Sequence, residues 1–583
     1  MTTPTARRLL AVAAVAVAFA AADTYVVVLA LPDMMLTVGL GVDELQRAAP
    51  IVSGFLLGYI AMLPLIGRIA DVRGRVPVLT ASLLVFSFGS LVTALAFDLP
   101  SVVTGRFLQG VGGGGLVPAT LALVADLYPP ERRAVPLGIV SAVQEVGSVL
   151  GPLLGAVVLA VAPWEAIFVL NLAVGLALAV VVGVAGDGVA GEPGARQNST
   201  LAKVRARHVP TTGPQRTPQL RKCGVVAVPD PLGLLLLAVF LAALVLLLWE
   251  PEALVTSVSL GTPFVPVVGE SRWLTPLALV AVVALVLLVA RCWWASRPLV
   301  DLRGWLRDAG RADPVGSGLL ALALAGVVLA FATADPAVRV FSPAGPWLLA
   351  GSAVAAVLLV LHLRRASDPL VPHGALRRRP AWGSLVVSFF VGAALIAALV
   401  DIPVYARLTT YRDSQLLAAL VLLRLLVAVP VGAVLGGRLA RRLAPGAVTA
   451  LGMTAAVAGF VWMGRWDAHS LEHWTATLPL VLTGLGFGLA LAPVNLALLD
   501  ATDAAVHGVA SALVVVARMV GMLVGISVLT TVGLRRYYEA YRPDHEVAAG
   551  IVQVHTIFTG AALCAALAGV LALTLFGRRP AVG

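Results

Sequence analysis

The sequence predicts an all-α polytopic membrane protein with about sixteen spanning helices. Its 583 residues are 60% hydrophobic and only 12% charged, and the mean hydropathy is +0.97. These values lie far outside the range of a soluble globular domain. Long apolar stretches recur between short segments rich in Pro, Gly and Arg. This pattern is typical of spanning helices and not of a membrane β-barrel.

The predicted spans follow one another along the whole chain, and each is long enough to cross a hydrocarbon core. They cover residues 9–31, 48–67, 78–97, 101–124, 134–161, 164–186, 231–249, 274–292, 314–332, 346–363, 381–406, 414–437, 446–464, 477–498, 507–534 and 551–576.

The charge distribution predicts the orientation of the chain. The net charge is +11, and the basic excess falls on the even-numbered loops and both termini, whereas the odd-numbered loops have an acidic balance. This positive-inside pattern predicts both termini in the cytoplasm. Only Lys203 and Lys222 of the 41 basic residues are lysine, which favours a bacterial protein and hence a bacterial cytoplasmic membrane. No nucleic-acid partner is expected, because the basic residues are scattered over many short loops instead of one surface.

The first apolar run contains an acidic residue, Asp23. Arg7, Arg8 and the stretch "AFA" at 18–20 also resemble a cleavable signal peptide. The apolar run nevertheless continues to Leu31 and is long enough to span. The alternation of basic and acidic loops also requires this helix to stay in place as the first span. Because a charged residue inside a bilayer is costly, Asp23 is a candidate functional residue.

The chain divides into four predicted regions. Residues 1–186 form a six-helix bundle, and 187–230 form a basic, polar cytoplasmic linker without apolar periodicity. Residues 231–380 contain four further helices, and 381–583 form a second six-helix bundle.

The two bundles repeat each other's features. "GRIADVRGRVPV" (67–78) and "GRLARRLAPGAV" (437–448) each follow the second helix of a bundle. "VGSVLGPLLG" (146–155) is likewise echoed by "VGMLVGISVL" (520–529). These echoes predict two six-helix halves in parallel relation.

The four helices between the halves also look duplicated. "DPLGLLLLAVFLAALVLLL" (230–248) resembles "DPVGSGLLALALAGVVLAF" (313–331), and "ASRPLVDLRGWLRD" (295–308) resembles "ASDPLVPHGALRRR" (366–379). We interpret them as one helical hairpin present twice. The alternative is that low-complexity Leu/Ala/Val sequence always resembles itself.

A glycine- and arginine-rich loop, "GRIADVRGR", joins the second and third helices. Its glycines permit a tight turn and a close helix approach, and its carboxylate can accept hydrogen bonds from a helix N-terminus. Its arginines face lipid headgroups or acidic partners. The loop resembles the cytoplasmic signature loop of the major facilitator superfamily, although Val72 and Val76 replace residues that are usually basic, which weakens the expected closing ion-pair network. Its candidate gating residues are Gly67, Arg68, Asp71, Arg73, Gly74 and Arg75.

The fourth helix contains "GRFLQGVGGGG", with the motif residues Arg106, Gln109 and Gly110. Arg106 resembles the superfamily's helix-four arginine that faces the first helix. Glycines 112–115 lack a following Gly-Lys-Ser/Thr and lie in the membrane, so close helix packing is the better explanation than a phosphate site.

The fifth helix contains "QEVGSVLGPLLGA". Gly147, Gly151, Pro152 and Gly155 resemble the motif of the superfamily's antiporters. Small residues at four-residue spacing make a smooth helix face, and a proline bends the helix. The resemblance implies export in exchange for a cation.

Six charged residues fall within the predicted spans, three of each sign, which suggests pairing. A cavity that alternates between a hydrated and an occluded state changes the pKa of a carboxylate in it, so the carboxylate can bind a proton in one state and release it in the other. We predict this role for Asp23 and Glu145. Permanent ion pairs that fix helix positions are the alternative. Permanent ion pairing is the favoured interpretation for Arg106, Arg518 and Asp401. For Arg424 both interpretations stay open.

The resemblance narrows further in "DTYVVV" (23–28), "QEVGSVLGP" (144–152) and "HGVASALVVVARMVGMLVG" (507–525). These segments are similar to the mycobacterial exporters that work beside a periplasmic lipoprotein and are associated with triacylglyceride export and multidrug tolerance. The likeness implies that Asp23 and Glu145 are proton-coupling acids with Arg424 as their partner. The chain departs from these exporters in its doubled hairpin and its short outer segment, 534–550.

The expected protein is therefore a major facilitator with four inserted helices, a monomer that exports lipids or amphipathic drugs. The proton gradient supplies its energy, and no cofactor or metal is expected. A periplasmic lipoprotein is a candidate partner. General drug efflux without a lipid role is the alternative. A lipid-modifying membrane enzyme is less expected, because Asp503 and His507 lack a neighbouring nucleophile or metal-ligand spacing.

Overall fold

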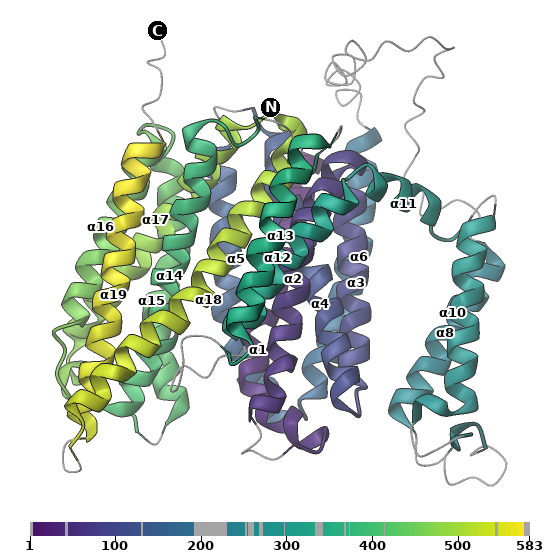
Figure 1. Ribbon diagram of the computed structural model, residues 1–583, viewed down its shortest axis with the longest axis horizontal. Helices are drawn as coiled ribbons and strands as arrows, with labels where there is room; N and C mark the ends of the chain where they lie inside the picture. Colours follow the sequence, from purple (N-terminus) through teal and green to yellow (C-terminus); the bar gives the residue numbers. More distant parts are fainter. Residues whose placement is uncertain are drawn as a thin grey trace.

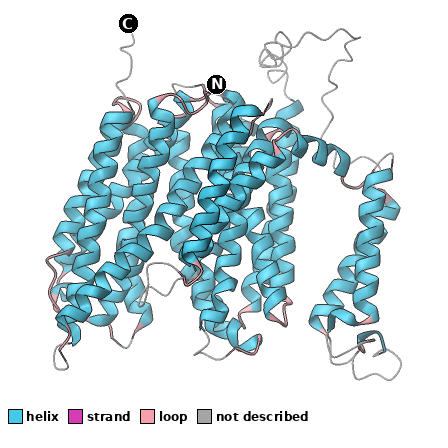
Figure 2. Ribbon diagram, viewed as in Figure 1, coloured by secondary structure: helices cyan, strands magenta, loops and turns pink. Residues whose placement is uncertain are grey.

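The structure, a computed structural model, is a layer of long helices that run side by side (Figures 1 and 2). The described residues contain helices, turns and loops but no strand. Most of the predicted 187–230 linker lies outside these residues. The structure describes residues 4–40, 45–129, 132–191, 230–250, 254, 262–267, 272–295, 298–332, 342–366, 369–371, 374–412, 414–542 and 546–576.

Six helices at each end of the chain form two bundles, which we call the first and second halves. The first half consists of α1 (Pro4–Thr37), α2 (Leu45–Arg73), α3 (Arg75–Ala94), α4 (Leu99–Leu127), α5 (Ala134–Val161) and α6 (Glu165–Gly191). The second half consists of α14 (Arg379–Leu408), α15 (Gln415–Leu439), α16 (Pro445–Met463), α17 (Thr477–Ala501), α18 (His507–Ala540) and α19 (Glu546–Leu575).

Among the described residues, fourteen helices are long and apolar enough to cross a membrane. The chain is therefore a multi-pass membrane protein. The helices α1 and α5, of 34 and 28 residues, are further long members of the first half. The total of sixteen spans stays a prediction.

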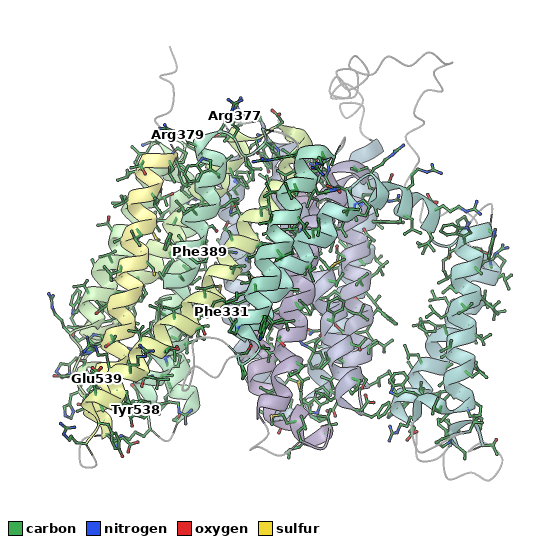
Figure 3. The ribbon with its side chains drawn as sticks, viewed as in Figure 1. Phe331, Arg377, Arg379, Phe389, Tyr538 and Glu539 are labelled. Atoms are coloured by element: carbon green, nitrogen blue, oxygen red, sulfur yellow. The ribbon has the colours of Figure 1, made fainter. Side chains whose placement is uncertain are left out.

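The bundle has two distinct edges. We call the edge where α1 begins and α19 ends the upper edge, as it is drawn in Figure 1, and the opposite one the lower edge. Arg377 and Arg379 lie at the upper edge, whereas Tyr538 and Glu539 lie at the lower edge (Figure 3). The positive-inside rule would place the upper edge in the cytoplasm.

The two halves meet near the upper edge through a symmetric pair of close helix crossings. A Cβ on Gly67 of α2 would lie 2.7 Å from the carbonyl oxygen of Gly508 at the start of α18. A Cβ on Gly437 of α15 would lie 2.6 Å from the carbonyl oxygen of Ala134 at the start of α5. The glycines of the two echoed loops therefore occupy equivalent places in the two halves and permit both crossings.

The chain between the halves forms two helical hairpins, and in each the aspartate before the first helix contacts a side chain near the end of the second helix. In the first, Arg291 Nε lies 3.0 Å from Asp230 Oδ2, and in the second, His362 Nε2 lies 2.8 Å from Asp313 Oδ1. The equivalent placement of these contacts in the two hairpins supports the predicted duplication. The helices are α8 (Pro231–Trp249), α10 (Pro276–Trp294), α12 (Pro314–Ala332) and α13 (Gly345–Arg365).

The two hairpins occupy different places. The first contacts α3, where Phe240 lies 6.1 Å from Phe88 between ring centroids, and it stands at the end of the layer (Figure 1). The second hairpin packs through α12 on α2 and α18, across the junction of the two halves.

One helix was not predicted. α11 (Leu302–Gly310) connects the hairpins, and Asp301 caps it by accepting a hydrogen bond from the backbone N–H of Gly304. This nine-residue helix contains arginines and an aspartate and has no long apolar run, so the apolar pattern does not predict it. Several spans also extend beyond the predicted bounds, because helices continue into the polar edges of the bundle. The first span, predicted over 9–31, is α1.

Candidate functional site

A buried ion pair joins α1 to α4. Arg106 Nη1 lies 2.8 Å from Asp23 Oδ2, and each residue is only 1% exposed. Asn171 of α6 donates a hydrogen bond from Nδ2 to the other carboxylate oxygen, Asp23 Oδ1. Buried charges are tolerated when they are paired and hydrogen-bonded. One carboxylate therefore ties together three helices of the first half.

The arginine side of this pair continues into neutral polar groups. Arg106 Nη1 also donates to Gln109 Oε1 at 2.8 Å, and Gln109 Nε2 donates to Ser90 Oγ at 2.8 Å. The guanidinium carbon of Arg106 lies 4.4 Å from the centroid of the Phe55 ring. The prediction that Arg106 faces the first helix is confirmed. We call Asp23, Arg106, Gln109, Asn171 and Ser90 the first-half polar cluster.

A second ion pair crosses between the halves. Arg518 Nη1 of α18 lies 3.8 Å from Glu145 Oε1 of α5. A narrow cavity lies beside this pair, lined from both halves by residues that include Gln144, Asn495 and Arg518. A movement of one half against the other would change the distance between Glu145 and Arg518. The same movement would leave the first-half polar cluster intact, because all its members belong to one half.

The carboxylate of Asp71 closes the upper edge. Its Oδ1 accepts a hydrogen bond from the backbone N–H of Gly508 at 2.9 Å, and Oδ2 accepts one from Val509 at 3.1 Å. These N–H groups belong to the first turn of α18, where the helix dipole favours an anion. The structure thus confirms that a helix N-terminus binds Asp71. Arg75 Nη2 lies 2.9 Å from the same carboxylate.

The other residues of the signature loop support this closure. Gly74 adopts φ +108° between α2 and α3, a backbone conformation that favours glycine. Arg73 Nη1 lies 2.6 Å from Asp308 Oδ2 of α11, and Arg75 Nε lies 3.3 Å from Asp126 Oδ2. Arg68 follows Gly67 in the last two turns of α2.

Glycines of α5 bring its backbone against α1. A Cβ on Gly147 would lie 2.0 Å from the carbonyl oxygen of Ala18, and one on Gly151 would lie 2.4 Å from that of Ala22. Gly155 is also buried. α5 is helical through Pro152, whose side chain lies outside the described residues. The antiporter motif therefore packs directly beside the turn of α1 that carries Asp23.

The remaining intramembrane charges lie apart from the two acids. Arg424 of α15 donates from Nη1 to Thr477 Oγ1 at 3.1 Å, within the second half. The structure does not bring Arg424 to Asp23 or Glu145, whose basic neighbours are Arg106 and Arg518. Asp401 is buried in α14, and no basic side chain pairs with it among the described residues.

His507, which the enzyme hypothesis considered, lies at the junction of α17 and α18. Its Nε2 lies 3.1 Å from the carbonyl oxygen of Leu499 and 3.2 Å from that of Thr502. These backbone contacts fix the connection between the two helices. They indicate a structural role.

Sequence reasoning missed two polar members of these contacts. Asn171 is a single amide within the apolar segment "FVLNLAVGL" (168–176), and a polar residue in a spanning helix is a usable signal for a buried contact. Asp308 lies in α11, where no helix was predicted. The pattern of apolar residues along the chain does not predict the contact of Asp308 with Arg73.

Comparisons with known proteins agree with this architecture. The profile of the Major Facilitator Superfamily matches residues 13–361 and 317–526. A triacylglyceride transporter of Mycolicibacterium hassiacum is 33% identical over 533 residues, which cover 90% of this chain and 78% of the relative. A triacylglyceride transporter of Mycobacterium tuberculosis strain H37Rv is 32% identical over 538 residues, 90% of this chain and 82% of the relative.

Solved structures show the same fold at low sequence identity. The human organic anion transporter MFSD10 superposes with a TM-score of 0.53 at 15% identity, over 98% of this chain and 100% of that one. The proton:xylose symporter XylE superposes with a TM-score of 0.51 at 13% identity, over 97% of this chain and 95% of that one.

Proposed function

Because the chain belongs to the major facilitator superfamily and is therefore a membrane transporter, we propose that it exports lipids such as triacylglycerides in exchange for protons. The two mycobacterial relatives named above are triacylglyceride transporters, which supports a lipid as the cargo. The observation that carries the coupling is the ion pair between Glu145 and Arg518, which joins the two halves beside the cavity.

Alternating access follows from the way the halves meet. The closing contacts of Asp71, Gly67 and Gly437 all lie near the upper edge. This arrangement supports a state that is closed at the upper edge. Rocking of one half against the other would open the upper edge and admit cargo from that side.

Proton coupling is assigned to Glu145. In the closed state its carboxylate lies 3.8 Å from the guanidinium of Arg518, and this neighbour favours the anion relative to an unpaired carboxylate in the same interior. When the halves rock, α5 and α18 move apart and the carboxylate loses this neighbour in a low-dielectric interior. It then binds a proton, because an unpaired buried charge is costly. Return to the closed state restores the pair and releases the proton.

Asp23 acts on the same step from within the first half. Asp23 lies in α1 directly after the segment that packs on Gly147 and Gly151 of α5. A change of charge at Asp23 would rearrange its bonds to Arg106 and Asn171 and shift α1 against α5. We assign Asp23 as a second proton-coupling acid on this ground. A periplasmic lipoprotein partner and a monomeric state stay predictions of the sequence.

The test uses purified protein in liposomes with a fluorescent triacylglycerol analogue and an imposed pH gradient. The parent protein should move the analogue faster when the gradient is present. Glu145→Gln should lower the gradient-dependent rate at least tenfold, because a neutral amide cannot exchange a proton. Asp401→Asn is the matched control, because it also removes a buried intramembrane carboxylate, and it should retain most of the rate.

A gradient-dependent rate that is equal in the parent and Glu145→Gln would overturn the coupling. Movement of an amphipathic dye without movement of the triacylglycerol analogue would favour the alternative function, general drug efflux. The two cargoes in one preparation separate these outcomes.

A further inference from the structure

The connecting helix α11 lies along the upper edge of the molecule, between the two hairpins (Figure 1). Its position follows from its neighbours, since α10 ends and α12 begins at this edge. A short helix between two spanning hairpins lies at the level of the lipid headgroups. Its side chains divide into two faces with different chemistry.

One face holds the signature loop. Asp308 Oδ2 lies 2.6 Å from Arg73 Nη1, and the guanidinium carbon of Arg73 lies 4.2 Å from the centroid of the Trp305 ring. Asp301 Oδ2 adds a weaker contact, 3.9 Å from Arg73 Nη2. Arg73 and Asp308 are each only 19% exposed at the side chain. This contact is therefore partly shielded from water and stronger than an ordinary surface pair.

The other face is basic. The guanidinium carbon of Arg303 on this face lies 5.6 Å from the centroid of the Trp293 ring. Arg303, Arg307 and Arg311 recur at four-residue spacing, which places them on one side of a helix, and all three are exposed. Trp293 and Trp294, at the end of α10, are 40% and 74% exposed. Exposed tryptophans beside arginines at a helix end are typical of a membrane–water interface.

We propose that the arginine face of α11 binds the phosphate groups of anionic lipids in the adjacent leaflet, and that this contact holds α11 against Arg73 and stabilises the closed upper edge. Charge complementarity selects the partner. Three exposed guanidiniums at headgroup depth attract anionic lipids and pair well with phosphate oxygens.

The link to the upper edge is short. Arg73 lies two residues after Asp71, whose carboxylate accepts hydrogen bonds from the first turn of α18. A clamp on Arg73 restrains the end of α2 on the side where the halves separate. The inserted hairpins thus supply an acidic partner to the signature loop, at a place where Val72 and Val76 provide no charge of their own.

The first experiment measures lipid binding by native mass spectrometry of the full chain titrated with phosphatidylglycerol or phosphatidylcholine. The triple variant Arg303→Gln, Arg307→Gln, Arg311→Gln should bind phosphatidylglycerol more weakly, by about fivefold for each arginine that contacts a headgroup. Its binding of phosphatidylcholine should not change. The matched control replaces three exposed arginines of the same edge, Arg377, Arg378 and Arg379, with glutamine. It should retain the phosphatidylglycerol affinity.

The second experiment measures closure by the distance between spin labels on exposed positions 132 and 443, in a variant without native cysteines. In nanodiscs with phosphatidylglycerol the short distance should dominate, and in phosphatidylcholine alone the long distance should gain population. The double variant Trp305→Ala, Asp308→Asn should still bind phosphatidylglycerol but should lose the effect of this lipid on the distance.

Two results would overturn the proposal. In the first, both triple variants lose phosphatidylglycerol binding equally, which would indicate general surface charge. In the second, the α11 triple variant loses lipid without any change in the label distance. Neither measurement requires transport, so a failure of lipid export in liposomes would leave this inference standing and would contradict only the proposed function.

Discussion

The two halves share their backbone packing but differ in their buried charges. A Cβ on Gly110 of α4 would lie 2.1 Å from the carbonyl oxygen of Phe55 in α2. A Cβ on Gly484 of α17 would lie 2.1 Å from the carbonyl oxygen of Leu425 in α15. The two glycines therefore occupy equivalent positions, and the same spacing relates the residues around them.

This correspondence assigns apolar residues of the second half to the charged positions of the first. Arg106, four residues before Gly110, corresponds to Leu480, four residues before Gly484. In α1, Asp23 comes directly after Ala22, which contacts Gly151. In α14, Ala394 comes directly after Ala393, which contacts Gly525 in the equivalent way. Leu480 and Ala394 are fully buried.

The difference indicates what the charges are for. The second half builds the same scaffold with a leucine and an alanine, so a six-helix half does not need a buried ion pair to pack. Buried ion pairs often stabilise no better than apolar residues of similar volume. We therefore expect the first-half polar cluster to serve transport and not packing, in agreement with its place beside the contact between α1 and α5.

The largest expected effect comes from breaking this pair on one side only. Arg106→Leu leaves the carboxylate of Asp23 buried without a cation, and we expect a loss of about 3 kcal/mol or more in the free energy of unfolding. The double variant Asp23→Ala, Arg106→Leu reproduces the residues of the second half and should recover most of that loss. Thermal unfolding of the purified variants in detergent measures both.

Transport separates the two explanations of the pair. The double variant should fold but should lose gradient-dependent export. A double variant that is as unstable as Arg106→Leu would contradict the comparison, because the charges would then be needed for packing. A stable double variant with full export would show that the cluster has no coupling role.

The second prediction concerns the packing that the halves share. Gly110→Ala and Gly484→Ala should each destabilise the protein, by roughly 1–3 kcal/mol, because a methyl group would overlap a carbonyl oxygen of the neighbouring helix. The two effects should be similar, unlike the effects of the charged residues. Melting temperatures of the two variants in the same detergent provide the measurement. A large effect at only one of them would contradict the equivalence.

Sequence analysis predicted what depends on pattern along the chain. The echoed loops predicted two parallel halves, and the position of Asp71 in the loop predicted after the second span (48–67) indicated its contact with a helix N-terminus. The resemblance predicted that Arg106 faces α1. These features follow from helix order and from short local motifs.

Contacts between helix faces could not be read in the same way. The likeness implied Arg424 as the partner of the two acids, but the structure places Arg518 beside Glu145 and Thr477 beside Arg424. Hydrophobic runs give the depth of a residue in the membrane but not the rotation of its helix. Among spans that are apolar on all sides, rotation is set by close glycine contacts such as that of Gly147, which appear only in the assembled bundle.

The third prediction tests the asymmetry of the upper edge. The crossing of α2 with α18 has the carboxylate of Asp71, whereas the echoed loop at the crossing of α15 with α5 has Arg441 at the corresponding position. A cation cannot accept hydrogen bonds from a helix N-terminus. Asp71→Asn should therefore weaken closure and lower the export rate about tenfold, through the loss of charge-assisted hydrogen bonds. Arg441→Gln should have a much smaller effect.

The smallest expected effect lies in the connections at the lower edge, where the two halves again use a related device. Asp98 and Ser101 form a capping box before α4, and Asp467 and Ser470 bond to each other before α17. The second half adds His469, whose Nδ1 lies 2.9 Å from Glu472 Oε1. The hydrogen bond and the charge of Glu472 raise the pKa of His469 above 6.5.

A raised pKa means that the folded protein binds the proton of His469 more tightly than the unfolded chain does. The contribution to stability is therefore complete below the ordinary pKa and is lost as the pH rises through the raised value. Because both side chains are exposed, the change in melting temperature should be small. Ring carbon shifts in protein labelled at histidine give a direct measurement. The midpoint of His469 should lie above 6.5 in the parent and should fall in Glu472→Gln, and an unchanged midpoint would show that Glu472 does not act on this histidine.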